Sequence, residues 1–311
     1  MSGQPLRLAL IGAGHWGTRY ALTINALPGV ALRWVASRRE RLPASAFVGV
    51  AHCAHWSGLP LAQLDAAIIA NATEDHIAAA AFCLQRSLPV LVEKPLALSA
   101  DEGRQLVRLS KRYATPFLVG FTHLYARPFE RLLRLLGRYG GAQAVLSQGG
   151  SSGPYRADIS PLWDYGAHDV AMALRVFRRR PVGVEAARLD GVKLGGHTAE
   201  NYRVQLRFET GQTARFEAGN AMAQKVRITR VVCPEADLVY DDLAPEKLRV
   251  IGHSKATHSK ATAVLLGEHE PPLARMVQAL VDTYNRRHRS HWSAALGVAV
   301  TAVLERCEKA L

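Results

Sequence analysis

A glycine-rich turn near the start of the chain constrains the fold more than any other segment. The apolar run LRLALI, residues 6–11, ends at GAGHWG, and the amphipathic segment TRYALTINAL follows it. Gly12, Gly14 and Gly17 stand in the GxGxxG spacing. Between a strand and a helix this spacing is typical of a dinucleotide-binding turn. Its glycines allow a tight turn, a close approach of pyrophosphate to the backbone, and close packing of helix on strand.

Apolar and helical segments alternate after this turn, up to about residue 121. Strands are predicted at residues 30–37, 65–72, 89–95 and 116–121, and helices at 18–27, 74–87 and 99–114. This rhythm implies a parallel sheet with helices on both faces. We therefore predict an α/β fold whose first domain, residues 1–121, is a Rossmann domain with a doubly wound parallel sheet.

The pattern changes beyond residue 121. Helices are predicted at residues 127–139, 166–177, 270–287 and 293–311, and strands at 142–150, 181–189, 200–209, 211–220, 224–233 and 236–242. Several of these strands alternate polar and apolar residues, as a half-buried antiparallel sheet does. Since 311 residues exceed a typical single core, we predict a second α/β domain over residues 122–311. Its sheet is expected to be open, mixed and largely antiparallel, and its last helix is free to pack back on the first domain.

Composition narrows the class of protein. The net charge is +13, but the arginines are spread along helices rather than gathered in one basic tail, so we expect no nucleic-acid partner. The excess of positive charge favours an anionic cofactor or substrate. The four cysteines are scattered, which argues against zinc and disulfides and favours the cytoplasm. No uninterrupted apolar run is long enough to span a membrane, and the first residues are typical of a strand rather than a signal peptide.

The start of the first helix and the end of the second strand predict the cofactor. Free N–H groups around His15 and Trp16 are expected to face the phosphates. The place where NAD enzymes carry an acidic residue for the ribose reads Ser37, Arg38, Arg39. Because arginine pairs with a 2′-phosphate that a carboxylate would repel, we predict NADP(H) rather than NAD(H), the alternative being that these arginines only face solvent.

Further polar residues follow the third predicted strand. Asn71 and Thr73 stand at the carboxyl edge of the sheet, where ligands bind, but either residue is equally suited to cap the next helix. His76 lies in the first turn of that helix. A surface or capping role is at least as well supported for His76 as a cofactor contact.

The segment LVEKPLALS places Glu93, Lys94 and Pro95 at the end of the fourth predicted strand. The proline restricts Lys94 to an extended conformation and so aims its side chain. Near a ligand and partly desolvated, Lys94 becomes usable as a proton donor or acceptor. Taken alone, the segment favours a surface lysine in a turn.

Asp164 and His168 stand four residues apart, which on a helix means the same face. The pair is compatible with a catalytic site, half of a metal site, or a polar contact that anchors the helix. A metal would require further ligands, and the other histidines do not have ligand spacing, so we expect no metal. Asp169 points in another direction and is interpreted as structural.

These motifs together resemble the Gfo/Idh/MocA oxidoreductases. The likeness includes the glycine turn, EKP, D-x-x-x-H, FLVGFTHLYARPFERL and the closing helix. The resemblance implies that Lys94 contacts substrate and cofactor, and that His168 is the general acid/base beside Asp164. Glu93 is expected near the cofactor. His123, Tyr125 and Trp163 are expected to contact the substrate, although the family often has arginine or asparagine in this region.

The resemblance implies an NADP(H)-dependent enzyme that moves hydride between nicotinamide and a hydroxyl or carbonyl of a sugar or nucleotide sugar. A homodimer or homotetramer is expected. Histidine suits the proton transfer because its ordinary pKa lies near neutral pH. Two alternatives remain open: reduction of a C=N bond, and a non-catalytic NADP-binding regulator. Lys94, Asp164 and His168 together argue against the regulator.

Overall fold

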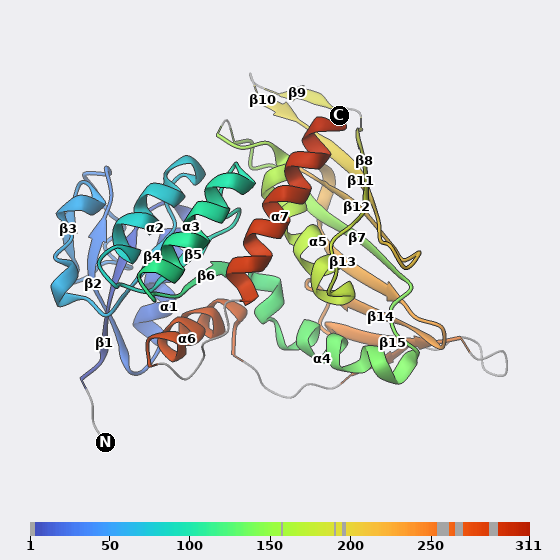
Figure 1. Ribbon diagram of the computed structural model, residues 1–311, viewed down its shortest axis with the longest axis horizontal. Coiled ribbons are helices and arrows are strands. Elements are labelled where there is room, and N and C mark those ends of the chain that lie inside the picture. The colour runs from blue at the N-terminus through green and yellow to red at the C-terminus, as the bar shows by residue number, and fades with distance from the viewer. Residues whose placement is uncertain are drawn as a thin grey trace. The chain divides into compact units, whose positions relative to one another are not determined.

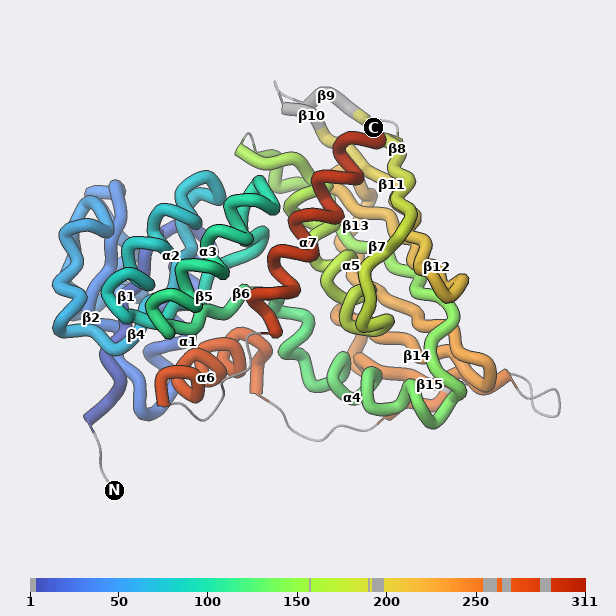
Figure 2. Tube along the Cα trace, in the orientation of Figure 1, coloured from blue at the N-terminus to red at the C-terminus, as the bar shows by residue number. Residues whose placement is uncertain are grey.

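The structure is a computed structural model, drawn as a ribbon in Figure 1 and as a trace in Figure 2. It describes residues 4–156, 158–189, 191–194, 197–253, 261–264, 270–285 and 292–311.

The chain divides into two compact units. Unit 1 comprises Met1–Thr122 and Glu270–Thr301, and unit 2 comprises His123–His269 and Ala302–Leu311. The expected domain limits differ in that they assign residues 270–301 to the second domain, and those limits stay a prediction.

Unit 1 is built on a six-stranded sheet in the order β3-β2-β1-β4-β5-β6, with every neighbouring pair parallel. The strands are β1 (Leu6–Ile11), β2 (Val30–Ala36), β3 (Ala51–Cys53), β4 (Ala66–Ile69), β5 (Val90–Glu93) and β6 (Phe117–Gly120). Every residue of β4, β5 and β6 is buried, as expected of strands covered on both faces. The predicted Rossmann sheet is confirmed, whereas the short strand β3 was not predicted.

Helices cover both faces of this sheet. They are α1 (His15–Ala26), α2 (His76–Leu84), α3 (Ala100–Arg112), α6 (Pro272–Tyr284) and the first half of α7 (Trp292–Lys309). In Figure 1, α2 and α3 lie side by side on one face, and α1 and α6 lie together on the other. The strand order reverses between β1 and β4, so the carboxyl ends of these strands form the crevice in which such sheets bind ligands.

Unit 2 contains an eight-stranded sheet in the order β16-β15-β14-β13-β7-β12-β11-β8. Its strands are β7 (Ala144–Ser152), β8 (Gly183–Arg188), β11 (Asn201–Arg207), β12 (Thr213–Gly219), β13 (Ala221–Val232), β14 (Ala236–Asp241), β15 (Leu248–Gly252) and β16 (Ala261–Ala263). Only the β7–β12 pair is parallel among the described pairings. The predicted mixed, largely antiparallel sheet is therefore confirmed. Strands β9 (Val192–Leu194) and β10 (His197–Ala199) form a separate antiparallel pair.

Two helices pack on one face of the second sheet. Helix α5 (Pro161–Phe177) packs on β7, β11 and β12, and α4 (Arg127–Leu135) packs on β14 and β15. The opposite face carries charged pairs such as Arg203 and Glu217, which face each other across β11 and β12 at 2.7 Å. Helix α5 begins at Pro161, five residues before the predicted start, because proline is favoured in the first turn of a helix.

A buried ion pair joins α5 to the sheet. Nη1 of Arg227 on β13 lies 3.0 Å from Oδ2 of Asp169, and both side chains are almost fully buried. Gly149 on β7 faces Arg227, and a Cβ at Gly149 would lie 2.1 Å from the same nitrogen. The guanidinium therefore occupies space that only glycine leaves open. Burial raises the pKa of Asp169, and the charge of Arg227 opposes that shift.

Among the described helices, none is both long and apolar enough to cross a membrane.

We expect Asp169→Asn to lower the free energy of unfolding by about 3 kcal/mol, because it leaves the buried Arg227 charge without its partner. Urea unfolding followed by circular dichroism measures this. Glu217→Gln removes a charge from a partly exposed pair and is the matched control, expected to cost less than about 1 kcal/mol. Equal shifts for the two variants would contradict a structural role for the buried pair.

Candidate functional site

The glycine turn between β1 and α1 adopts a geometry that other residues would disrupt. Gly12 has a φ of +104°, and a Cβ there would lie 2.5 Å from the carbonyl oxygen of Ala70. A Cβ at Gly17 would lie 2.0 Å from the carbonyl oxygen of Gly12. At Gly14 a Cβ would meet nothing within 4 Å. The first and third glycines therefore permit close packing, and the second faces open space in which a phosphate can approach the backbone.

Helix α1 starts directly at this open space. Gly14 provides no side-chain cap, and the first turn contains no acidic residue. The first N–H groups of the helix have no partner within it, and together with the helix dipole they favour an anion. The side chain of His15 is exposed, and that of Trp16 lies under the Arg19 guanidinium at 5.0 Å.

The end of β2 presents two exposed arginines. Ser37 is buried, and its carbonyl oxygen lies 2.8 Å from Nε2 of His52. The backbone N–H of Arg39 donates to Oγ of Ser37 at 3.2 Å, which fixes the turn. The side chains of Arg38 and Arg39 are exposed, and neither forms an ion pair with another described residue.

Asn71 carries a buried side-chain amide at the end of β4. Its side-chain nitrogen and oxygen are both buried, and neither has a hydrogen-bond partner among the described residues. Buried polar groups in folded proteins are nearly always paired, and an unpaired one costs about 1–3 kcal/mol. The helical turns after Asn71 and Thr73 show no side-chain cap, so the capping alternative is not observed. Asn71 borders the glycine turn, since a Cβ at Gly12 would lie 2.6 Å from the Asn71 backbone nitrogen. An unpaired amide beside such a turn suits a residue that hydrogen-bonds to a dinucleotide.

His76 is not at the surface. It is 1 % exposed, and its Nδ1 lies 2.9 Å from the carbonyl oxygen of Pro95. The surface interpretation is therefore wrong, because the ring connects the segment after β4 to the segment after β5. A cofactor contact for His76 stays a prediction.

Glu93 and Lys94 are both buried, at 4 % and 9 % exposure. One carboxylate oxygen of Glu93 accepts from the Tyr20 hydroxyl at 2.6 Å, and the other accepts from the backbone N–H of Lys94 at 3.0 Å. The Lys94–Pro95 peptide bond is cis. The interpretation of Lys94 as a surface residue is therefore wrong, and Glu93 holds the backbone that presents it.

In unit 2, Asp164 and His168 lie one turn apart near the start of α5. Oδ1 of Asp164 lies 3.8 Å from Nη1 of Arg156. Arg156 also makes two hydrogen bonds to Asp158, and this pairing lowers the pKa of Asp158. Asp164 therefore faces a positive charge that favours its ionised form.

His168 is 9 % exposed and packs against a second histidine. The ring of His123 meets it edge to face, with centroids 4.8 Å apart and an interplanar angle of 83°. His123 comes from the short helical turn Thr122–Tyr125. The structure thus brings together two predicted site residues that are distant in sequence.

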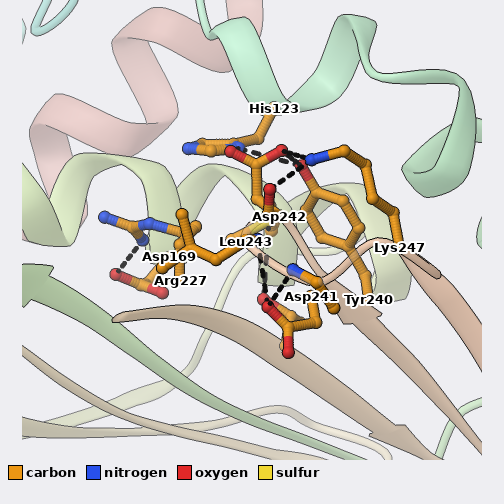
Figure 3. A network of polar contacts seen from close by, with 11 residues as sticks. His123, Asp169, Arg227, Tyr240, Asp241, Asp242, Leu243 and Lys247 are labelled. Carbon is orange, nitrogen blue, oxygen red and sulfur yellow. Dashed lines mark hydrogen bonds and ion pairs between the residues drawn. The ribbon is translucent and has the colours of Figure 1, made fainter. Parts of the chain in front are cut away.

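His123 also joins a polar cluster that the sequence did not predict (Figure 3). Its Nδ1 lies 3.1 Å from the Tyr240 hydroxyl, which lies 3.1 Å from Oδ1 of Asp242. Nζ of Lys247 lies 3.4 Å from the same carboxylate oxygen. Burial, and then the charge of Asp242, raise the pKa of Tyr240 well above its ordinary value. The available signal was a tyrosine in the apolar strand ADLVY followed by two aspartates.

The other two predicted substrate residues are buried. Tyr125 is 8 % and Trp163 is 3 % exposed, which favours a packing role. Substrate contact for Tyr125 and Trp163 stays a prediction. Within the described residues, no group of three or more histidine, cysteine, aspartate or glutamate side chains is arranged to hold a metal ion.

Comparison with known proteins adds a family likeness. A family model described as "Oxidoreductase family, NAD-binding Rossmann fold" matches residues 6–121. A protein from Magnetospirillum magnetotacticum MS-1 with a known crystal structure is 31% identical, with a TM-score of 0.88. That likeness covers 98% of this chain and 100% of the other.

Two relatives named as dehydrogenases are more distant in sequence. UDP-N-acetylglucosamine 3-dehydrogenase from Acidithiobacillus ferrooxidans is 25% identical over 73% of this chain and 71% of that enzyme. Inositol 2-dehydrogenase 2 from Saccharopolyspora erythraea is 28% identical over 54% of this chain. That match spans 52% of the inositol enzyme's own length.

We expect Gly14→Ala and Gly17→Ala to act differently. The first adds a methyl group where a phosphate would approach, and is expected to weaken NADPH binding at least about tenfold with little change in thermal stability. The second forces a Cβ against the Gly12 carbonyl and is expected to lower the melting temperature. Fluorescence titration and differential scanning fluorimetry measure the two effects.

Gly137→Ala, which also meets nothing within 4 Å, is the control for Gly14→Ala and is expected to leave NADPH binding unchanged. Unchanged NADPH binding by Gly14→Ala would contradict a phosphate at this turn.

Proposed function

The chain belongs to the Gfo/Idh/MocA family of oxidoreductases, and from this premise we propose an NADP(H)-dependent dehydrogenase that acts on a sugar or nucleotide-sugar hydroxyl. The observation that carries the proposal is the unpaired, buried Asn71 amide beside a glycine turn open at Gly14. The Asn71 amide supports the binding of a dinucleotide, and His168 on α5 supports a proton-transfer step.

The first glycine turn and the segments after β2 and β4 would hold the cofactor. The N–H groups at His15 and Trp16 suit the pyrophosphate, Asn71 and Thr73 line the crevice, and Arg38 with Arg39 suits a 2′-phosphate. When bound, the nicotinamide supplies the carbon that accepts or donates hydride.

His168 is proposed to move the proton. Oxidation of an alcohol leaves a proton on oxygen, and a neutral imidazole held by a buried helix is suited to accept it. Asp164 is proposed to orient the substrate or the imidazole, since the positive charge of Arg156 lies 3.8 Å from its carboxylate. Lys94, described in unit 1, is proposed as a second group acting on the reacting oxygen.

The charges near His168 support an uncharged reacting group. Three cations in this part of unit 2 are paired with carboxylates: Arg156 with Asp158, Arg227 with Asp169, and Lys247 with Asp242. None of these three offers an unpaired charge to an anion. The hydroxyl-bearing ring of a sugar fits such surroundings better than a carboxylate or phosphate does. An anionic substrate would therefore carry its charge on a part that lies away from these three cations.

We expect His168→Asn to lower turnover at least about a hundredfold while NADPH binding stays intact, because positioned proton transfer contributes about 10²–10⁴ in rate. The assay follows NADP⁺ reduction with myo-inositol, UDP-N-acetylglucosamine and other sugars, and NADPH oxidation with ketones and imines. His253→Asn is the matched control: His253 follows β15 and pairs with Asp237, at the end of β14 that is remote from Tyr240.

Full activity in His168→Asn would overturn the assignment of the proton carrier. Turnover of imines alone would favour C=N reduction over sugar oxidation. NADPH binding without turnover of any compound would favour a regulator.

We expect the double variant Arg38→Ala, Arg39→Ala to raise KM for NADP⁺ at least about tenfold and to leave KM for NAD⁺ nearly unchanged. The lost hydrogen bonds to a charged phosphate are worth about 1.5–3 kcal/mol each. Steady-state kinetics with both cofactors measure this, and Arg33→Ala, which changes an exposed arginine within β2 itself, is the control. A parallel change in KM for both cofactors would contradict recognition of the 2′-phosphate.

A further inference from the structure

The contacts of His123 determine which of its nitrogens carries the proton. A carboxylate only accepts hydrogen bonds, so the single hydroxyl proton of Tyr240 is donated to Asp242. The Tyr240 oxygen must then accept from Nδ1–H of His123 at 3.1 Å. Tyr240 keeps its proton because its pKa lies well above the ordinary value. Neutral His123 is therefore held as the Nδ1–H tautomer, with Nε2 as the acceptor.

The same contacts bias where an extra proton binds. Oδ2 of Asp242 lies 3.9 Å from Nδ1 of His123, which favours a positive charge on that ring. The His168 ring lies against His123, and two imidazolium rings in contact repel each other. The two histidines therefore take up a first proton as a pair, and Asp242 directs that proton to His123.

We propose that His123 is a positioning residue for proton transfer: tethered by Tyr240 and Asp242, it takes the first proton of the pair and so keeps His168 neutral as a proton acceptor. This inference deepens the proposed function and rests on His168 being the proton carrier. It assigns His123 a role distinct from the substrate contact that the sequence predicted.

Other charged groups around the pair are largely compensated. Asp164, one turn before His168 on α5, lies 3.8 Å from Arg156, whose positive charge offsets that of the carboxylate. Lys247 donates to the backbone carbonyl of Asp242 and lies near its carboxylate, so it weakens but does not cancel the effect of Asp242 on His123. The Asp169–Arg227 ion pair is neutral as a unit.

Two further acidic groups lie on neighbouring elements. Asp241 faces the adjacent turn, where its carboxylate accepts from the N–H groups of Leu243 and Ala244. Helix α4 adds Glu130 in its first turn. Any charge that these carboxylates add is negative, so it favours a proton on the histidine pair as Asp242 does.

The test is histidine NMR on the full chain without substrate. Long-range ¹⁵N–¹H spectra of protein labelled with ¹⁵N-histidine separate Nδ1–H from Nε2–H, and spectra of His123→Gln and His168→Gln assign the signals. We expect His123 as the Nδ1–H tautomer. We expect His123→Gln to raise the pKa of His168, and Asp242→Asn to lower the pKa of His123, each by about half a unit or more.

Tyr240→Phe removes only the tethering hydroxyl and is expected to give His123 as a mixture of tautomers. Tyr202 lies on β11, and its hydroxyl donates to Glu200. Tyr202→Phe removes this hydroxyl and is the matched control, expected to leave the signals of both histidines unchanged. An Nε2–H tautomer for His123 in the unmodified protein, or a pKa of His168 that is unaffected by His123→Gln, would overturn the inference. The tautomer is read from the unmodified protein. If His123→Gln fails to fold, the histidine signal that changes in both Tyr240→Phe and Asp242→Asn identifies the His123 ring.

Activity supplies a second readout. With any compound that is oxidised, we expect the acidic limb of the kcat profile of His123→Gln to move to higher pH by about half a unit or more, because His168 then takes up the proton itself. The pH profile of Tyr202→Phe is expected to match that of the unmodified enzyme. If His168→Asn keeps full turnover, the proposed function fails whatever the NMR shows. If His168→Asn is inactive but the two rings titrate independently, only this inference fails.

Discussion

The rotation of helix α5 on the second sheet depends on the buried ion pair between Asp169 and Arg227. The guanidinium fits because Gly149, directly opposite on β7, has no side chain, so the pair sets both the rotation and the height of the helix. His168 precedes Asp169 by one residue, which on a helix is about 100° around the axis. Anchoring Asp169 therefore aims His168 at the ring of His123. Burying two charges brings little net stability, and what the pair contributes here is orientation.

Much of the fold could be predicted from the sequence because local pattern and tertiary environment agree. The apolar runs ending at Ile69, Glu93 and Gly120 form strands that are buried on both faces, where continuous apolar sequence is required. Strands β3 and β15 were not among the strands predicted from the sequence. Ala51–Cys53 has three residues at a sheet edge, and its pairing with β2 defines it rather than any pattern of its own. The alternation in β15 is too short to stand out beside the turn that precedes it.

Some features of the candidate site could likewise be predicted from the sequence, and others could not. The positive φ of Gly12 and the close approach of Gly17 to the Gly12 carbonyl could be predicted, because they depend on backbone geometry within a few residues. The burial of His76 and the tether of His123 could not, because they depend on partners far away in the chain. His123 and Tyr240 are 117 residues apart. No sequence periodicity indicates that the short helical turn of His123 lies against the end of the strand that carries Tyr240. Sequence identifies which residues are able to carry protons, and the fold determines which of them meet.

Buried polar groups in this protein fall into two kinds, and the difference bears on function. Both carboxylate oxygens of Glu93 accept hydrogen bonds within the protein, and Oδ2 of Asp169 accepts from the Arg227 guanidinium, so the charge on each carboxylate is held by a partner inside the fold. The amide of Asn71 has none among the described residues and keeps the cost of lost hydration. A ligand that pairs with this amide recovers that cost in the folded state alone, which makes it a stabiliser of the fold as well as a reactant. Stability and cofactor affinity are thereby coupled at the carboxyl end of β4, whereas the ion pair under α5 holds its geometry without any ligand.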